Sequence, residues 1–170
     1  SHDGEGHVIR MIEFDQAFKD GQVPVRLAKR INYGLGYPFF NFNYPFIYYL
    51  GEGFHLLGLS EVASFKTLMV ISVIVGSLSL YFLTLAFFGK IGAFISALFF
   101  IFAPYKFLNI YVRGNVAESV GLSLIPLLLF SLDYFIKGGK LKNIFLVTVL
   151  SILILSHNIL SLIFLPFLSL

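Results

Sequence analysis

The fold of this chain is decided by an uncharged stretch, TLMVISVIVGSLSLYFLTLAFFG, at Thr67–Gly89. About 20 apolar residues in a helix span the ~30 Å hydrocarbon core of a bilayer, so this stretch predicts a transmembrane helix. The whole composition agrees, since 58% of the 170 residues are hydrophobic and only 12% are charged. Soluble domains carry about 25% charged residues, so the chain is predicted to be an integral membrane protein.

Three further apolar runs follow, at 91–105, 117–136 and 143–170. The first is short for a span, so a thin crossing and a re-entrant segment both remain open. The second is long enough to cross, and we expect a kink at its Pro126. The fold class is therefore predicted to be all-α, a polytopic membrane helical bundle with about four transmembrane helices in residues 67–170.

Residues 1–66 differ from this body, because ten of the 21 charged residues lie in the first 30 positions. Val8–Lys19 predicts a helix that lies along the bilayer surface rather than crossing it. Arg10 and Glu13 lie opposite the apolar side of this helix, whereas Asp15 falls within that side. We expect residues 1–66 to form a loop that carries interfacial helices.

An aromatic, proline-punctuated loop at Tyr33–Pro45 suits the membrane–water interface. Phe46–Leu59 predicts a second short helix, in the interface or dipping into the bilayer. On it, Glu52 and His55 are three residues apart, which fits either simple solvation or a role in a site. A basic group before the loop either contacts lipid headgroups or grips the phosphate of a lipid-linked substrate. Its members are Arg26, Lys29 and Arg30.

Charge placement predicts which polar segments share a compartment. The short connection Lys137–Lys142 contains three lysines and no acid, and short basic loops stay cytoplasmic. Counting helices back from it puts Lys90 on the cytoplasmic side, and residues 1–66 and the turn Tyr105–Ala117 on the external side. The net charge of +3 needs no nucleic acid as partner, because basic residues near the lipid bilayer account for it.

The stretch HDGEGH at residues 2–7 supplies the first candidate site residues, Asp3, Glu5 and His7. In an extended strand these alternate side chains point one way. Such ligands could hold Mg²⁺ or Mn²⁺, although acids and histidines at a membrane surface are commonly just solvated. If the segment is helical instead, Asp3, His7 and Arg10 share one face.

Arg113 is the candidate phosphate ligand in the external turn, with Arg10 second, because a guanidinium matches phosphate oxygens bidentately. Glu118 either fixes Arg113 for this role or merely pairs with it. His157 lies about 20 Å into the membrane from the cytoplasmic side. It is either the floor of an outward-facing site or part of a helix–helix hydrogen bond.

Cysteine is absent, so no disulfide or thiolate metal site is expected. The chain opens at Ser1 without a Met and stops at Leu170 within an apolar run. We therefore expect it to be a fragment, completed by further helices of its own chain before and after it.

Three stretches together resemble a bacterial family of polytopic membrane proteins. They are HDGEGHVIRMIEFDQAFKDGQVPVR, YGLGYPFFNFNYPFIYYLGEGFHLLGLS and APYKFLNIYVRGNVAESVGLSLIPLLLFSL. The family is called the 6-pyruvoyl-tetrahydropterin synthase-related membrane domain. It is similar in turn to the GT-C superfamily of glycosyltransferases and to the YfhO-like membrane proteins.

This resemblance implies a function at the external face of the bacterial plasma membrane. GT-C enzymes have an aspartate in the first external loop and use polyprenyl-phosphate-linked sugars, and Asp3 sits where that aspartate should be. Asp3 is then the candidate general base, a role worth about 10²–10⁴-fold in rate, with Glu5 and His7 beside it. Two alternatives remain open: a transporter or flippase for a lipid-linked or anionic solute, lined by Arg113 and His157, and a non-catalytic scaffold.

Overall fold

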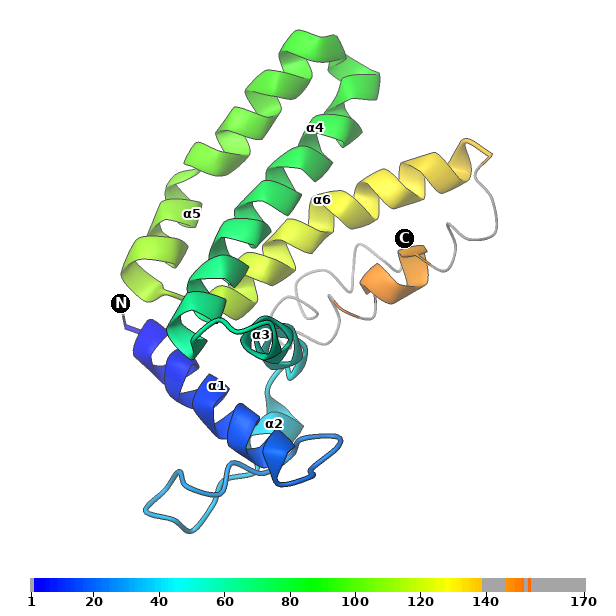
Figure 1. Cartoon of the computed structure of the whole chain (residues 1–170). Coiled ribbons are helices and arrows are strands. Elements are labelled where there is room, and N and C mark those ends of the chain that lie inside the picture. Colours follow the sequence, from blue (N-terminus) through cyan, green and yellow to red (C-terminus); the bar gives the residue numbers. More distant parts are fainter. Residues whose placement is uncertain (1, 139–145, 152, 154–170) are drawn as a thin grey trace.

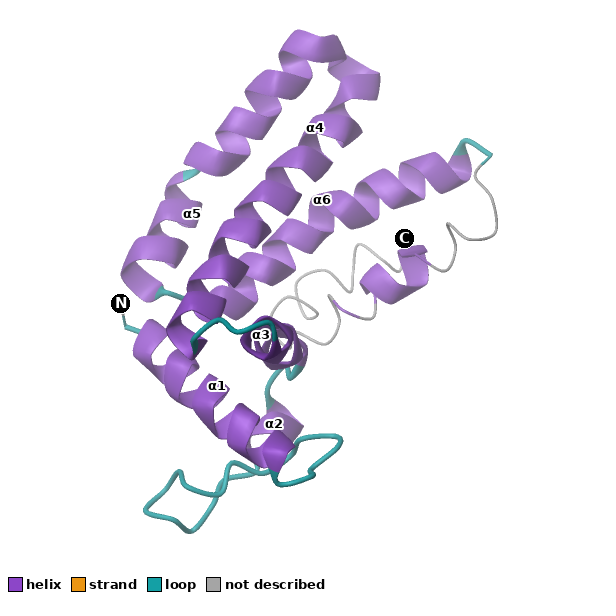
Figure 2. Ribbon diagram, in the orientation of Figure 1, coloured by secondary structure: helices purple, strands orange, loops and turns teal. Residues whose placement is uncertain are grey.

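The structure is a computed structural model that describes residues 2–138, 146–151 and 153 (Figure 1). All its regular elements in this part of the chain are helices (Figure 2). They are α1 (Gly4–Lys19), α2 (Phe39–Phe42), α3 (Phe46–Leu56), α4 (Glu61–Phe102), α5 (Pro104–Phe107), the π-helix η1 (Leu108–Arg113) and α6 (Val116–Ile136). Residues 146–151 are also helical, and the rest of the predicted span at 143–170 lies outside the described residues.

Helix α4 is a hairpin of two arms rather than one rod. Gly89 breaks its helical geometry with φ 67° and ψ −174°, and the chain folds back there (Figure 1). Glycine adopts such a positive φ without the steric cost that a Cβ would impose. Two described stretches are long and apolar enough to cross a membrane, Glu61–Arg113 and Val116–Ile136. The first of them is the stretch that folds back.

The predicted helices are present at 67–89, 91–105 and 117–136, but their ends differ from those expected, and the count of about four transmembrane helices stays a prediction. The helix through Thr67–Gly89 begins earlier, at Glu61, because Ser60 caps it by accepting the N–H of Ala63 at 3.3 Å. Helix α6 matches the prediction closely and contains Pro126.

The expectation of a loop after Pro104 is wrong. α4 ends at Phe102, but α5 and η1 continue the helical path to Arg113, where Gly114 turns the chain with φ 70°. Pro104 does not stop the path because it stands in the first turn of α5. There a proline lacks only an N–H that would have no helical partner.

Close packing joins both arms of α4 to α6. A Cβ added at Gly76 would lie 2.4 Å from the ring of Phe100 and 3.0 Å from Oγ of Ser123. Small residues at such crossings let helices in a membrane approach closely, where van der Waals contact drives association. Gly76 therefore marks the point at which the two arms and α6 meet.

The surface helices α1, α2 and α3 share an aromatic core. Phe14 packs edge-on against Phe40 and Tyr49, with ring centroids 5.2 and 4.7 Å apart. Tyr48 and Phe39 are buried beside them. The aromatic loop thus supplies core residues as well as interfacial ones, and edge-to-face pairs of this kind add about 0.5–1.5 kcal/mol beyond area burial.

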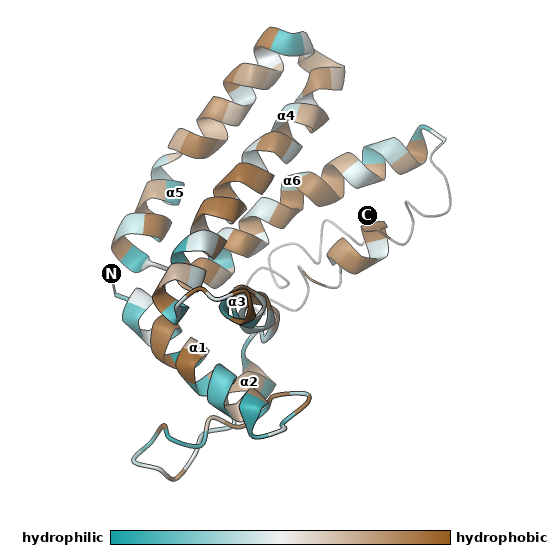
Figure 3. Cartoon of the chain, viewed as in Figure 1, coloured by the Kyte–Doolittle hydropathy of each residue, from teal (hydrophilic) through white to brown (hydrophobic). Residues whose placement is uncertain are grey.

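Helix α1 differs from its prediction in two respects. It begins at Gly4 rather than Val8, despite its two early glycines. Its buried side is only partly its apolar side, since Phe14 is buried as expected, but Glu13 is buried too and Ile12 is 38% exposed. The reason is a specific partner, because Glu13 accepts the backbone N–H of Arg30 at 3.1 Å. Figure 3 shows the resulting mixture of polar and apolar residues on α1 beside the apolar arms of α4.

Charged residues of the bundle lie at both of its ends. Nζ of Lys137, at the end of α6, lies 5.3 Å from the ring centroid of Phe87, next to the Gly89 turn. The start of α1 lies at the other end, beside η1 (Figure 1). This arrangement is compatible with the predicted sidedness, in which Lys90 and Lys137–Lys142 face the cytoplasm. The sidedness itself stays a prediction.

Replacement of Gly76 by alanine should destabilise the bundle by about 1–3 kcal/mol, because the added methyl group forces the Phe100 ring to move. Thermal unfolding in detergent measures this loss. Gly53→Ala is the matched control, since a Cβ there has no neighbour within 4 Å, and it should be neutral or mildly stabilising. Equal melting temperatures for Gly76→Ala and the parent protein would contradict the three-way contact.

Candidate functional site

Two backbone hydrogen bonds tie the start of the chain to the end of η1. The N–H of His2 donates to the carbonyl of Val112 at 3.1 Å, and the N–H of Asp3 donates to the carbonyl of Arg113 at 2.7 Å. Asn115 then starts α6 by accepting the N–H of Glu118 on its side chain at 3.1 Å. The two segments that the sequence proposed as one site are therefore in direct contact.

The carboxylate of Asp3 is available for chemistry at this junction. Asp3 occupies the N-cap position of α1, but its side chain makes no capping hydrogen bond. The residue is partly buried, and within the described ranges its carboxylate has no hydrogen-bond partner.

Arg113 is held by two neighbours at the same junction. Its Nη1 donates to Oε2 of Glu118 at 2.7 Å and to the hydroxyl of Tyr105 at 3.2 Å. The Tyr105 hydroxyl also donates to Glu118. The guanidinium is 35% exposed, so it is fixed in place yet reachable. The predicted pair of Arg113 and Glu118 is therefore present, and the role of Glu118 in fixing Arg113 for phosphate stays a prediction.

Tyr44 lies among the charged groups of this junction, and the sequence reasoning did not single it out. Burial raises the pKa of its hydroxyl above the usual value. Four charged side chains also act on that hydroxyl, and they are Arg10, Asp3, Glu118 and Arg113. Tyr44 thus connects the charges of α1 with those of the η1–α6 turn. The Tyr44-Pro45 step in the aromatic loop was the available signal.

Arg10 stands over an aromatic face rather than in an acid pair. Its Cζ lies 4.4 Å from the ring centroid of Phe39. A guanidinium stacked in this way keeps its N–H donors at the edges, where they can bind an anion. Arg10 therefore remains a second phosphate ligand in the hypothesis.

His7 is a core residue and not a solvent-facing acid or base. It is 1% exposed, and its Nδ1 lies 3.1 Å from the hydroxyl of Tyr48. Its ring stacks between Tyr48 and Phe65. Burial, helped by the positive charge of Arg10, lowers the pKa of His7 to about 4, so the imidazole is neutral at pH 7. Its role is to position α1 rather than to exchange protons with a substrate.

A cation site made of Asp3, Glu5 and His7 does not fit this geometry. The segment is helical from Gly4, and helical residues two apart diverge by about 200°. Glu5 is accordingly exposed while His7 is buried. The extended-strand arrangement that would have aligned the three ligands is absent.

The basic group before the aromatic loop is largely engaged with α1. Nζ of Lys29 pairs with Asp20 at 2.9 Å, and Nη2 of Arg30 donates to Gln16 at 3.0 Å. Arg26 is exposed. These pairs favour structural and headgroup contacts over a grip on a substrate phosphate. His157 lies outside the described residues.

A buried polar seam runs from this junction into the bundle, and sequence reasoning missed it. Lys106 is 4% exposed, and its Nζ donates to Oγ of Ser123 at 3.1 Å. Asn109 donates to Oγ of Ser119 at 3.1 Å. The signal was a helical spacing, because Lys106, Asn109 and Arg113 lie at i, i+3 and i+7. The assumption of a loop after Pro104 hid it.

Lowering the pH from 7 to 5 should destabilise the folded protein through His7. Because its folded pKa is below the unfolded 6.5, the unfolded state binds more protons as pH falls below 6.5, and the folded state loses about 2 kcal/mol between pH 7 and pH 5. Thermal melts at both pH values, compared between the parent protein and His7→Gln, isolate this contribution. His2→Gln, an exposed control, should keep the parental slope. Identical slopes for the parent and His7→Gln would contradict a buried neutral imidazole.

Residues 40–170 match the sequence profile of a family described as the 6-pyruvoyl-tetrahydropterin synthase related domain, a membrane protein. The matched range includes Arg113 and Glu118, whereas Asp3 precedes it. No curated protein and no solved structure matches the chain. The match covers more than half of the chain, which is enough to assign the family. The two helical stretches that could cross a membrane agree with its description as a membrane protein. The chain belongs to the 6-pyruvoyl-tetrahydropterin synthase related domain family of membrane proteins.

Proposed function

We propose that this chain forms the substrate-binding part of a membrane glycosyltransferase of the GT-C kind. Its donor would be a sugar linked to a polyprenyl phosphate, and transfer would occur at the external face of the bacterial plasma membrane. One observation carries the proposal: the backbone bond of 2.7 Å from the N–H of Asp3 to the carbonyl of Arg113, which brings the residue of the candidate base and the residue of the candidate phosphate ligand together in the fold. Sugar transfer from a lipid phosphate needs these two groups together.

Each group has a distinct task in this reaction. The oxygen of the acceptor hydroxyl attacks the anomeric carbon of the sugar, and the Asp3 carboxylate accepts the proton of that hydroxyl. The bond from that carbon to the phosphate oxygen breaks, and the leaving lipid phosphate takes the electron pair. Arg113 offsets the charge that develops on this phosphate. Arg10 and the Tyr44 hydroxyl are further donors for the phosphate oxygens.

An apolar pocket near the junction supports a lipid-linked donor. It measures about 160 Å³ and lies between α3, α4 and α6 in the described part of the chain. Its lining residue Val120 stands on α6, the helix whose first turn carries Glu118, although the two side chains point to different sides of that helix. The pocket could hold part of an apolar prenyl chain.

The transporter alternative has one observation in its favour. Lys106 is buried within the helical stretch Glu61–Arg113, seven residues before Arg113. Ionisable groups within membrane segments commonly mark ion or solute pathways. Sugar transfer is favoured here because hydrogen bonds to Ser123 and Ser119 already engage the Lys106 ammonium.

Asp3→Asn should reduce sugar transfer by about 10²–10⁴-fold, because the amide cannot accept the acceptor proton. The assay uses membranes that contain the complete protein and a panel of radiolabelled polyprenyl-phosphate sugars. Glu5→Gln is the matched control, since Glu5 is exposed on the same helix turn, and it should retain activity. Undiminished turnover by Asp3→Asn would exclude the proposed base.

Arg113→Gln and Glu118→Gln should act in opposite directions on phosphate binding. Loss of the guanidinium weakens binding of radiolabelled polyprenyl phosphate to protein in nanodiscs, by about tenfold or more. Loss of the Glu118 carboxylate frees Arg113 from its 2.7 Å partner and should tighten binding. If both variants instead melt at lower temperature and bind phosphate as the parent does, the pair is structural and the assignment fails.

A further inference from the structure

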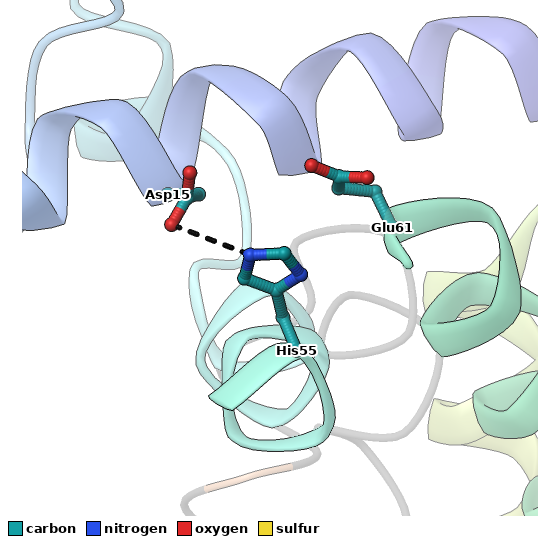
Figure 4. Close-up of side chains that lie close together, drawn as sticks. All are labelled: Asp15, His55 and Glu61. Atoms are coloured by element: carbon teal, nitrogen blue, oxygen red, sulfur yellow. Dashed lines mark ion pairs between the residues drawn. The ribbon is translucent and has the colours of Figure 1, made fainter. Parts of the chain in front are cut away.

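Three potential metal ligands from separate elements converge at the far end of α1. They are Asp15 on α1, His55 on α3 and Glu61 at the start of α4. One ligand atom from each lies within 4.8 Å of the others. Figure 4 shows the imidazole of His55 between the two carboxylates.

Asp15 contributes a buried carboxylate oxygen that lacks a hydrogen bond. The residue is 2% exposed, and its Oδ1 has no hydrogen-bond partner in the described part of the molecule. The Lys19 ammonium lies 2.7 Å from Oδ1, but it donates its hydrogen bond to Oδ2, at 2.8 Å. Oδ1 instead points at Nε2 of His55, 3.8 Å away (Figure 4). The Lys19 ammonium therefore balances the charge of this buried carboxylate, and a metal ion bound to Oδ1 would take over that role.

His55 is oriented as a metal ligand would be. Its Nδ1 lies 2.9 Å from the carbonyl of Leu59, and since a carbonyl only accepts, Nδ1 carries the hydrogen. The lone pair of the neutral ring is then on Nε2, which faces Asp15. Metal-binding histidines are commonly fixed by such a bond from the other ring nitrogen.

The surroundings carry an excess of negative charge. Glu52 is buried next to Asp15, close enough for the two carboxyls to repel, and its Oε1 also lacks a hydrogen bond. Glu61 adds a third carboxylate. Lys19 is the balancing cation, and its side chain is 56% exposed, so it can swing into solvent when another cation takes its place.

We propose that Asp15, His55 and Glu61 bind one divalent transition-metal ion of the Zn²⁺ or Mn²⁺ class. One imidazole nitrogen and two carboxylate oxygens suit such ions, whereas Mg²⁺ and Ca²⁺ prefer oxygen alone. Ligand atoms at about 2.0–2.2 Å from an ion lie roughly 3–4 Å apart, which the 3.8 Å between Asp15 and His55 already matches. Three protein ligands leave a position for water.

The ion would stabilise the packing of the surface helices α1, α2 and α3, at a place separate from the contact between Asp3 and Arg113. Twelve residues of helix between Asp3 and Asp15 correspond to about 18 Å. The ion would hold α1 and α3 against the first turn of α4. This inference does not depend on sugar transfer, and the two proposals can fail independently.

The test is metal binding by the complete protein, purified without a polyhistidine tag and held in nanodiscs. Titration with Zn²⁺ and then Mn²⁺, followed by elemental analysis, should give one ion per chain and a raised melting temperature. His55→Gln and Glu61→Gln, at partly exposed positions, should each weaken binding by about tenfold or more. Asp15→Asn should do the same, and circular dichroism shows whether each variant is folded.

Two lysine variants sharpen the result. Lys19→Gln removes the competing ammonium and should tighten metal binding several-fold. Lys29→Gln is its matched control, because it breaks an exposed pair with Asp20 on the same helix end and should change nothing. Folded His55→Gln and Glu61→Gln that bind the ion as the parent does would overturn the proposal, as would a parent that binds no ion at micromolar concentrations.

Discussion

Two backbone hydrogen bonds, from residues 2 and 3 to Val112 and Arg113, are the constraint on which the site depends. They fix where α1 starts, and the helix then carries Asp3, His7 and Arg10 at set positions along it. Because backbone groups make them, these bonds do not depend on side-chain identity at the junction. Asp3 and Arg113 therefore meet through the path of the chain, while the side chain of Arg113 is held by Glu118.

The bundle supports this junction by satisfying polar groups inside an apolar body. In lipid each buried donor needs a partner, and the seam of Lys106, Asn109, Ser119 and Ser123 provides partners between η1 and α6. The Gly89 turn brings η1 back alongside the first arm of α4 and so returns the chain to the level of α1. The surface helices α1, α2 and α3 are held together by their aromatic core. In our proposal they are also held by an ion near Asp15, at the end of α1 that lies away from Asp3.

The sequence predicted an all-helical membrane protein correctly, whereas the count of four transmembrane helices and the site residues stay predictions. The helices at Thr67–Gly89 and around Pro126 follow from length and composition, which do not depend on tertiary contacts. The buried face of α1 could not be predicted in this way. Glu13 is buried because its carboxylate accepts a hydrogen bond from the backbone N–H of Arg30, which lies 17 residues later in the chain. The helical path after Pro104 was missed because a proline also suits the first turn of a helix. Asp3 and Arg113 were proposed from residue type and from the family resemblance, whereas Tyr44, Lys106 and the Asp15–His55–Glu61 group needed three-dimensional proximity.

The most direct measurement joins the two segments chemically from one side of the membrane. The chain has no cysteine, so His2→Cys and Val112→Cys, both at exposed positions, give a background-free pair. A short, membrane-impermeant, bifunctional thiol reagent added outside intact cells should cross-link them efficiently, with each single variant as control. Labelling of only one of the two cysteines from outside, with no cross-link, would contradict the shared junction and with it the proposed site.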